Sequence, residues 1–440
     1  MRYIEEYRTV QDFLDRVCKQ VRAKPMHAEI REELLSHIEE RAELLMLEGN
    51  AEEPAVLEAV RQMGEPEEIG RSLHMAHRPQ LDWKLLVLIG LLSIIGLFGM
   101  LSVDYSETHE FTGLFAHKAT FLGFGVIFLV LFYFLDYRKL KKYSGAIFFF
   151  TLCLMTYTLF RGATINGQTL FLDIGPIMIP MLGIVSCFLL LIALVGMKPV
   201  SQWGIWEGTL NMLYRGVLPV VLYALSDSMV YLVIYLLGFL GITWVTSRNL
   251  KHFFSLMFLP FTSLAIVLLT KQQYLMWRLE RVMDREGDGG YVMRVTSDAI
   301  SSAGWFGHGF AAPNPGIPYV HSDSVFTYLI YCFGWLFGIA LGIMILWFLA
   351  RIWTISSVLQ DTYAKNIVTA VIIVFSMRML IPLFMGLGVI PAVSLDPPFI
   401  SYGGTNQLID LAVVGLILSI YRRKNMIPSD LGGIEAVRVK

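Results

Sequence analysis

The sequence predicts an all-α, polytopic membrane protein with about ten transmembrane helices, preceded by a small helical domain outside the membrane. Hydrophobic residues make up 55% of the 440 residues and charged residues only 16%, against about 25% charged residues in soluble domains. Ten apolar runs follow residue 82, and most approach the roughly 20 residues that a helix needs to cross a bilayer. The bilayer is therefore the expected solvent for most of the chain.

Residues 1–82 are predicted to form an acidic helical domain. They hold 18 of the 36 acidic residues and 11 of the 35 basic residues, so this segment carries a charge of −7 and the remainder +6. Apolar residues recur every three or four positions from Ile30 to Met46, the pattern of an amphipathic helix. Gly49 and Asn50 end that helix, and a shorter one follows from Pro54 to Met63.

This first segment resembles the short helical domain found ahead of permease-like segments in many bacterial proteins. The matching stretches are residues 34–39 (LLSHIE) and 63–70 (MGEPEEIG). The resemblance implies a cytoplasmic docking or regulatory module. The alternative is a folded cap that only stabilises the first membrane helix.

The membrane domain is expected over residues 83–424, with a tail at 425–440. Its predicted spans are 85–103, 119–135, 143–160, 178–197, 216–226, 229–246, 253–271, 324–350, 367–390 and 406–421. The fifth span is short, and its boundary with the sixth is the least defined. No apolar run stands near the start as a signal peptide would require, so insertion is expected to use the membrane helices themselves.

Basic residues define the expected orientation. They follow the second, sixth, eighth and tenth spans, at Arg138, Lys139, Lys141, Lys142, Arg248, Lys251, Arg351, Arg422, Arg423 and Lys424. Because positive charge favours the cytoplasmic side, both termini are predicted to be cytoplasmic. The four cysteines, Cys18, Cys153, Cys187 and Cys332, have spacings that suit neither a zinc site nor a disulfide framework.

The long outer loop at 272–322 carries cations where the positive-inside tendency predicts few. These are Arg278, Arg281, Arg285 and Arg294. Guanidinium groups there favour an anionic ligand such as a lipid pyrophosphate. Alternatively, the arginines pair for stability with the acids of the same loop, Glu280, Asp284, Glu286, Asp288 and Asp298.

The residues before the last span cannot form ordinary membrane helix. Residues 398–405 read PFISYGGT, with a second proline at Pro397. Proline lacks an amide donor and glycine weakens helix interiors, so such backbone is tolerated at membrane depth only where protein or water satisfies it. A second run rich in small residues, 301–309 (SSAGWFGHG), is expected to pack its backbone closely, as a half-buried turn.

These motifs together resemble the SEDS family (shape, elongation, division and sporulation), which contains the RodA and FtsW type peptidoglycan polymerases. Residues 387–391 (LGVIP) and 398–405 resemble the family signature "LGLLP…PFISYGGS". Gly290-Tyr291, residues 299–309 and residues 321–326 (HSDSVF) follow the order of further family motifs. The resemblance covers roughly residues 84–424.

The resemblance implies transfer of glycan between two molecules of lipid II, an undecaprenyl-pyrophosphate-linked disaccharide-pentapeptide, at the outer face of the membrane. A family aspartate in the long outer loop serves as general base for the acceptor hydroxyl. Counting from Arg278 places that aspartate at Asp288, with Asp284 as second choice. The alternative is that these are exposed loop acids without a special role.

Departures from the family pattern leave two other functions open. Residues 180–183 (PMLG) replace the polar family motif at the fourth span, which favours a noncatalytic scaffold that binds lipid II or a partner. A flippase for a lipid-linked precursor would also carry charges within its spans. Arg378 and Asp410 are such charges, and we expect them to face one another or the substrate groove. A purely structural pair is the alternative.

The predicted substrate-binding residues are Arg278, Arg281, His321, Asp323, Ser401, Tyr402, Gly403, Gly404, Arg378 and Asp410. The resemblance implies no organic cofactor and is compatible with a divalent cation, Mg²⁺ or Mn²⁺, although no sequence cluster has ligand spacing of its own. The expected partners are lipid II and a class B penicillin-binding protein, with no nucleic acid. The expected location is the bacterial cytoplasmic membrane, in cell-wall synthesis linked to shape, division or sporulation.

Overall fold

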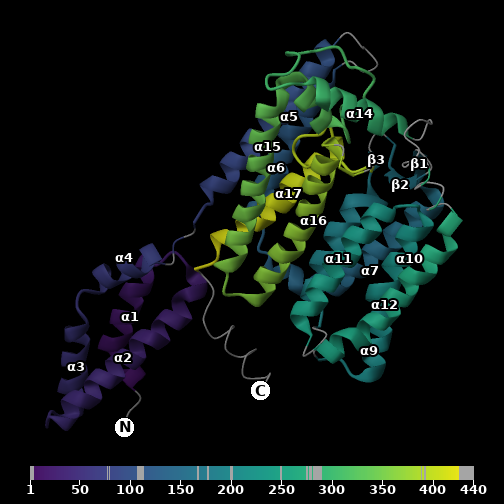
Figure 1. The fold of residues 1–440 in the computed structure, drawn as a ribbon. Helices are drawn as coiled ribbons and strands as arrows, with labels where there is room; N and C mark the ends of the chain where they lie inside the picture. Colours follow the sequence, from purple (N-terminus) through teal and green to yellow (C-terminus); the bar gives the residue numbers. More distant parts are fainter. Residues whose placement is uncertain are drawn as a thin grey trace. The chain divides into compact units, whose positions relative to one another are not determined.

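The computed structural model describes two compact units. One contains Met1–Asp82, Val358–Thr362 and Ile420–Lys440, and the other contains Trp83–Ser357 and Tyr363–Ser419. The described residues are 4–76, 78, 80–106, 113–165, 168–175, 178–198, 202–247, 250–273, 276, 280, 290–387, 389–390 and 393–425. Figure 1 colours these elements along the sequence.

The first unit contains a four-helix core. Its helices are α1 (Arg8–Gln20), α2 (His27–Leu47), α3 (Glu52–Met63) and α4 (Pro66–Ala76), with 3₁₀ turns at Ile4–Glu6 and Lys24–Met26. Helix α2 packs on α3, and α1 packs on α4. Their apolar faces share one core, which includes Val10, Val17, Ile30, Ile38, Val56 and Ala59. Amphipathic periodicity thus accounts for this unit.

The helix boundaries of this unit follow local chemistry. Helix α2 ends at Leu47, and Gly49 has the positive φ of +100° that glycine adopts readily. Helix α3 begins at Glu52, two residues before the predicted start at Pro54. Glu52 and Glu53 stand in its first turn, where acidic side chains interact favourably with the helix dipole.

The second unit holds the membrane helices. They are α5 (Trp83–Tyr105), α6 (Leu114–Phe134), α7 (Arg138–Arg161), α8 (Ser186–Gly196), α9 (Ile205–Asn211), α10 (Leu218–Leu225), α11 (Met229–Thr246), α12 (Leu250–Thr270), α14 (Tyr291–Ser302), α15 (Val325–Ser357), α16 (Thr362–Gly386) and α17 (Gly404–Arg422). Within the described residues, eight helices are long and apolar enough to cross a membrane, and two shorter apolar helices lie at Met181–Gly196 and Leu256–Thr270. The predicted polytopic fold is confirmed.

The fifth predicted span is longer than its apolar run. Instead of 216–226, an apolar helix extends over Trp206–Leu225. It consists of α9, the π-helical segment η5 (Met212–Val217) and α10. Hydropathy missed its first half because Glu207 and Arg215 interrupt the apolar run, although Arg215 is 5% exposed in the folded chain.

A small antiparallel sheet precedes α8 and was not predicted. Strand β1 (Ala163–Ile165) pairs with β2 (Gln168–Asp173), which pairs with β3 (Met178–Ile179). The strands have two to six residues, too few for the alternating pattern to stand out from noise. The π-helical segment η3 (Met181–Val185) then leads into α8.

The turn at 303–309 packs its backbone against a kink in α15, as its small residues predict. Gly334 interrupts the helical geometry of α15 with φ +81°. Around it, His308 N donates to Tyr331 O at 3.0 Å, and Trp335 N donates to Gly304 O at 2.9 Å. A Cβ at Gly307 would collide with the backbone of Cys332, so glycine is required for this approach.

Helices α15, α16 and α17 lie side by side in Figure 1. Side-chain contacts agree, since the rings of Phe348 and Phe375 are 5.6 Å apart and Arg378 is paired with Asp410. Phe399, from the segment before α17, packs edge-on against Phe348 and at a tilt against Phe375. These aromatic contacts hold the irregular segment at 394–404 in the bundle.

Candidate functional site

The segment at 394–404 is a strained turn that begins α17. Phe399 has φ +66°, a left-handed conformation that is costly for a bulky residue. Gly403 and Gly404 have φ +41° and +27°. Tyr402 N donates to His321 O at 2.8 Å, which joins this turn to the segment before α15. The predicted site residues His321 and Tyr402 are therefore neighbours.

Lys118 of α6 reaches the inner side of this turn. Its Nζ donates to Phe399 O at 3.0 Å and to Ser401 O at 2.5 Å. The lysine is fully buried. Sequence analysis missed this residue, although a lone lysine at the start of an apolar run was a signal, because charges at membrane depth are costly.

Two carboxyl groups meet beside the turn. Asp323 is hydrogen-bonded to Asp396, and Asn406 Nδ2 donates to Asp396 Oδ2 at 2.7 Å. Burial and the neighbouring Asp396 carboxylate raise the pKa of Asp323 to about 8. Asp323 is therefore predicted to keep its proton near neutral pH. From the sequence, Asp323 was predicted as a site residue and Asp396 was not.

Arg378 and Asp410 form a fully buried ion pair between α16 and α17. The prediction that they face one another is confirmed. Asp410 lies about 9 Å along the axis from the start of α17, at the usual rise per residue. Both charges also interact electrostatically with Asp396, and Asp410 with Lys118. The ion pair and the acid pair therefore belong to one polar cluster.

Several buried polar atoms of this cluster have no protein partner. They are Arg378 Nε, Asp410 Oδ2, Asn406 Oδ1 and both side-chain polar atoms of Gln407. Gln407 is 2% exposed and lies one turn before Asp410 on the buried face of α17. We define the polar cluster as Lys118, Asp323, Arg378, Asp396, Asn406, Gln407 and Asp410. Native proteins pair such atoms with ordered water or a ligand.

Aromatic rings lie around Tyr402. The His321 ring is 6.2 Å and the His117 ring 6.3 Å from it, centroid to centroid, both roughly edge-on. Tyr402 and His321 are partly exposed, and His117 is exposed. Burial raises the pKa of Tyr402, so its hydroxyl keeps its proton and can donate a hydrogen bond.

Four predicted site residues lie outside the described residues. They are the catalytic candidates Asp284 and Asp288 and the substrate-binding candidates Arg278 and Arg281. The remaining candidates, from His321 to Asp410, are described and gather at the turn or in the polar cluster. Their proximity follows from the packing of α6, α16 and α17 around the segment at 394–404.

The predicted divalent cation stays a prediction, because the loop acids Asp284 and Asp288 lie outside the described residues. Within the described part of the chain no group of three or more His, Cys, Asp or Glu side chains could hold a metal ion. Asp323 and Asp396 offer two neighbouring carboxyl groups, fewer than the about six oxygen ligands that Mg²⁺ usually takes.

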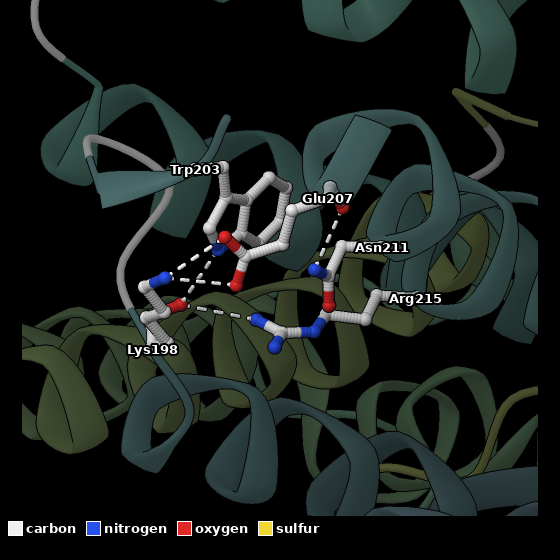
Figure 2. A network of polar contacts seen from close by, with 5 residues as sticks. All are labelled: Lys198, Trp203, Glu207, Asn211 and Arg215. Carbon is white, nitrogen blue, oxygen red and sulfur yellow. Dashed lines mark hydrogen bonds and ion pairs between the residues drawn. The ribbon is translucent and has the colours of Figure 1, made fainter. Parts of the chain in front are cut away.

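A second polar network, at residues 198–215, differs in its pairing (Figure 2). Lys198 Nζ contacts both carboxylate oxygens of Glu207 at 2.9 and 2.8 Å. Lys198 O accepts hydrogen bonds from Trp203 Nε1 and Arg215 Nη1, each at 3.2 Å. The Arg215 guanidinium lies 4.9 Å from the centre of the Trp203 ring. Apart from Arg215 Nε, which is buried without a partner, these groups satisfy one another, as expected of a scaffold.

The fold and the site together define the class of protein. It is a polytopic helical membrane protein in which a strained turn packs over buried charged side chains. Residues 79–426 match the family model of FtsW, RodA and SpoVE, described as cell cycle proteins. The chain belongs to this family. The predicted SEDS resemblance is confirmed over the whole membrane domain.

Individual relatives agree with this assignment. The chain is 23% identical to the probable peptidoglycan glycosyltransferase FtsW of Shewanella sediminis over 80% of this chain and 89% of that protein. It is 30% identical to the FtsW of Thiomicrospira cyclica, but that alignment spans only 38% of this chain and 46% of the relative. Escherichia coli MrdB, a peptidoglycan glycosyltransferase, is 25% identical over 36% of this chain and 43% of the relative.

Solved structures share the fold. A chain of a peptidoglycan synthase complex superposes with a TM-score of 0.65 and 23% identity, over 78% of this chain and 98% of that chain. RodA, the rod shape determining protein of Thermus thermophilus, superposes with a TM-score of 0.58 and 20% identity, over 78% and 97%. The membrane helices are therefore arranged as in this family.

Proposed function

We propose that this protein is a peptidoglycan glycosyltransferase that polymerises lipid II at the outer face of the cytoplasmic membrane. The observation that carries the proposal is the family match over residues 79–426, combined with a polar cluster beneath the signature turn. Several relatives bear the name peptidoglycan glycosyltransferase. A buried cluster with unpartnered donors and acceptors suits a site that takes a polar headgroup from the membrane.

In the proposed chemistry, a general base removes the proton of an acceptor hydroxyl of one lipid II. The hydroxyl oxygen then forms the new glycosidic bond to the sugar of the other lipid II, whose bond to pyrophosphate breaks. We assign the general base to Asp288, with Asp284 as second choice. A carboxylate suits this task because it is ionised at neutral pH and can accept the hydroxyl proton as the new bond forms. Arg278 and Arg281 would neutralise the pyrophosphate. A Mg²⁺ or Mn²⁺ ion, if used, would supply the same charge at the leaving group.

The surroundings of the proposed reaction follow from the same assignment. Both termini would be cytoplasmic, with the loop at 272–322 outside. A class B penicillin-binding protein is the proposed partner, since a peptidoglycan synthase complex contains a chain of the same fold. The proposed process is cell-wall synthesis linked to shape, division or sporulation.

Incubation of the purified protein with labelled lipid II tests the proposal. We expect glycan polymer from the wild type, alone or with a class B penicillin-binding protein. Asp288→Ala or Asp284→Ala should abolish it, whereas Asp298→Ala serves as a matched control in the same loop. Polymer that persists in both single variants and in the double variant would contradict the assigned base.

A noncatalytic scaffold is the second candidate, favoured by one observation. At the fourth span, where the family motif is polar, Met181, Leu182 and Gly183 are apolar and buried. Lipid II binding without polymer, in every divalent-metal condition, would favour the scaffold. Movement of labelled lipid across vesicles would instead favour a flippase.

A further inference from the structure

The strained turn before α17 has its carbonyl groups directed into the bundle. Phe399 holds a left-handed conformation with φ +66°. Its oxygen and that of Ser401 both accept hydrogen bonds from Lys118 Nζ, at 3.0 and 2.5 Å. A residue other than glycine keeps such a conformation only when its surroundings enforce it. Lys118 supplies that enforcement.

Helix α5 closes the opposite side of this arrangement at Gly96. A Cβ atom there would lie 2.6 Å from Phe399 O, 2.7 Å from Ile400 O and 2.7 Å from Lys118 Cε. All three contacts are closer than side-chain atoms approach one another, and two of the three neighbours are backbone oxygens that cannot move alone. Gly96 therefore allows the turn and the lysine stem to pack against α5.

Lys118 is a polar side chain in an apolar position. Its amino group is fully buried, and it interacts electrostatically with Asp410 and Asp396. Burying a polar group is costly unless it is hydrogen-bonded. The contacts of Lys118 meet that condition, because they fix the carbonyl groups of the turn and lie beside the adjacent carboxyl groups.

The geometry points to Lys118 as a positioning residue for the proposed reaction. Gly96 lacks a side chain and so leaves the room that the Lys118 stem needs. The ammonium group holds the turn that joins Tyr402 to His321 and that leads into Asn406, the hydrogen-bond donor to Asp396. Lys118 acts through these groups and contacts no substrate itself. The inference rests on the proposed function for its activity readout.

Two variants test the clamp formed by Lys118 and Gly96. Lys118→Met keeps the length of the stem and removes the donors, and Gly96→Ala pushes the turn away. Gly90→Ala is the matched control, because a Cβ there meets nothing within 4 Å on the same helix. We expect faster amide hydrogen exchange across residues 399–404 in both variants and no change in the control.

Lys118→Met should lower the activity of the molecules that remain folded. We expect kcat for lipid II polymerisation to fall about tenfold or more, since small misplacements of a site are costly, with KM within about threefold. The thermal midpoint should fall, because Phe399 O and Ser401 O lose their donor, so kcat is measured per folded molecule. Lys118→Arg, which keeps a cation and donors, should restore part of the turnover.

Two results would overturn the inference: unchanged hydrogen exchange at 399–404, or unchanged kcat per folded molecule in both variants. If the wild type makes no polymer, the proposed function fails by itself. Hydrogen exchange still decides the clamp in that case, because it requires no lipid II.

Discussion

The polar cluster around Arg378 is buried among apolar helices, whereas the ion pair of the network at Lys198 is nearly half exposed, and the two regions pair their charges differently. In the 198–215 network, Lys198 O accepts two hydrogen bonds, and Lys198 Nζ contacts both carboxylate oxygens of Glu207. The Arg215 guanidinium lies near the Trp203 ring. Of the side-chain atoms drawn in Figure 2, one is buried and has no hydrogen-bond partner, Arg215 Nε. In the polar cluster, five such atoms remain.

This difference distinguishes a scaffold from a site. A buried donor or acceptor without a partner costs free energy, so a fold retains several together only where water or a ligand completes them. The 198–215 network holds a connection between helices and has little left to bind. The polar cluster, next to the family signature turn, keeps unpaired hydrogen-bond donors and acceptors that water or a ligand can complete.

The largest expected effect comes from breaking the ion pair of the polar cluster. Arg378→Met leaves Asp410 as an uncompensated buried charge and should reduce the free energy of unfolding by about 3–5 kcal/mol. The double variant Arg378→Met/Asp410→Leu should recover most of this loss. Thermal unfolding in detergent measures both. If the double variant is as unstable as the single one, the pairing does not explain the cost.

Asp323 should make stability depend on pH. Its folded pKa of about 8 lies above the ordinary value of about 3.9, so the folded state binds a proton that the unfolded state releases. Stability should therefore fall as pH rises from about 4 to about 8 and level off above. Asp323→Asn should flatten this slope, whereas Asp298→Asn should leave it. Parallel pH profiles for wild type and Asp323→Asn would refute the raised pKa of Asp323.

Arg215 of the 198–215 network should contribute less than Arg378. Arg215→Met removes its contact with Trp203 and one of two hydrogen bonds to Lys198 O, for a loss of about 2 kcal/mol. Lipid II turnover per folded molecule should not change. A loss of turnover without a loss of stability would show that this network takes part in function.

The smallest effect is expected at Lys198. Its ion pair with Glu207 is nearly half exposed on both sides, and such pairs contribute little. Lys198→Met should match the wild type in thermal midpoint and in turnover. A clear loss in either measurement would mean that the scaffold depends on this ion pair more than its exposure indicates.

The departures of the structure from the sequence-based expectations concern contacts between distant segments. Hydropathy located the spans but started the fifth one too late, because Glu207 and Arg215 look polar until the 198–215 network pairs them. The short sheet from β1 to β3 was not predicted, because its strands have too few residues to show the alternating apolar pattern of a strand. The Arg378–Asp410 pair was predictable because two charges in apolar runs need partners.

The sequence by itself determined the membrane class, the helical first unit, the family and the signature turn, since hydropathy, periodicity and motif order are properties of neighbouring residues. Only the tertiary structure brought Lys118 to Phe399, 281 residues away along the chain, and Asp396 to Asp323. No local pattern encodes such contacts, because helix packing decides which buried groups meet. The same packing gives Asp323 its raised pKa and leaves Gln407 without a partner.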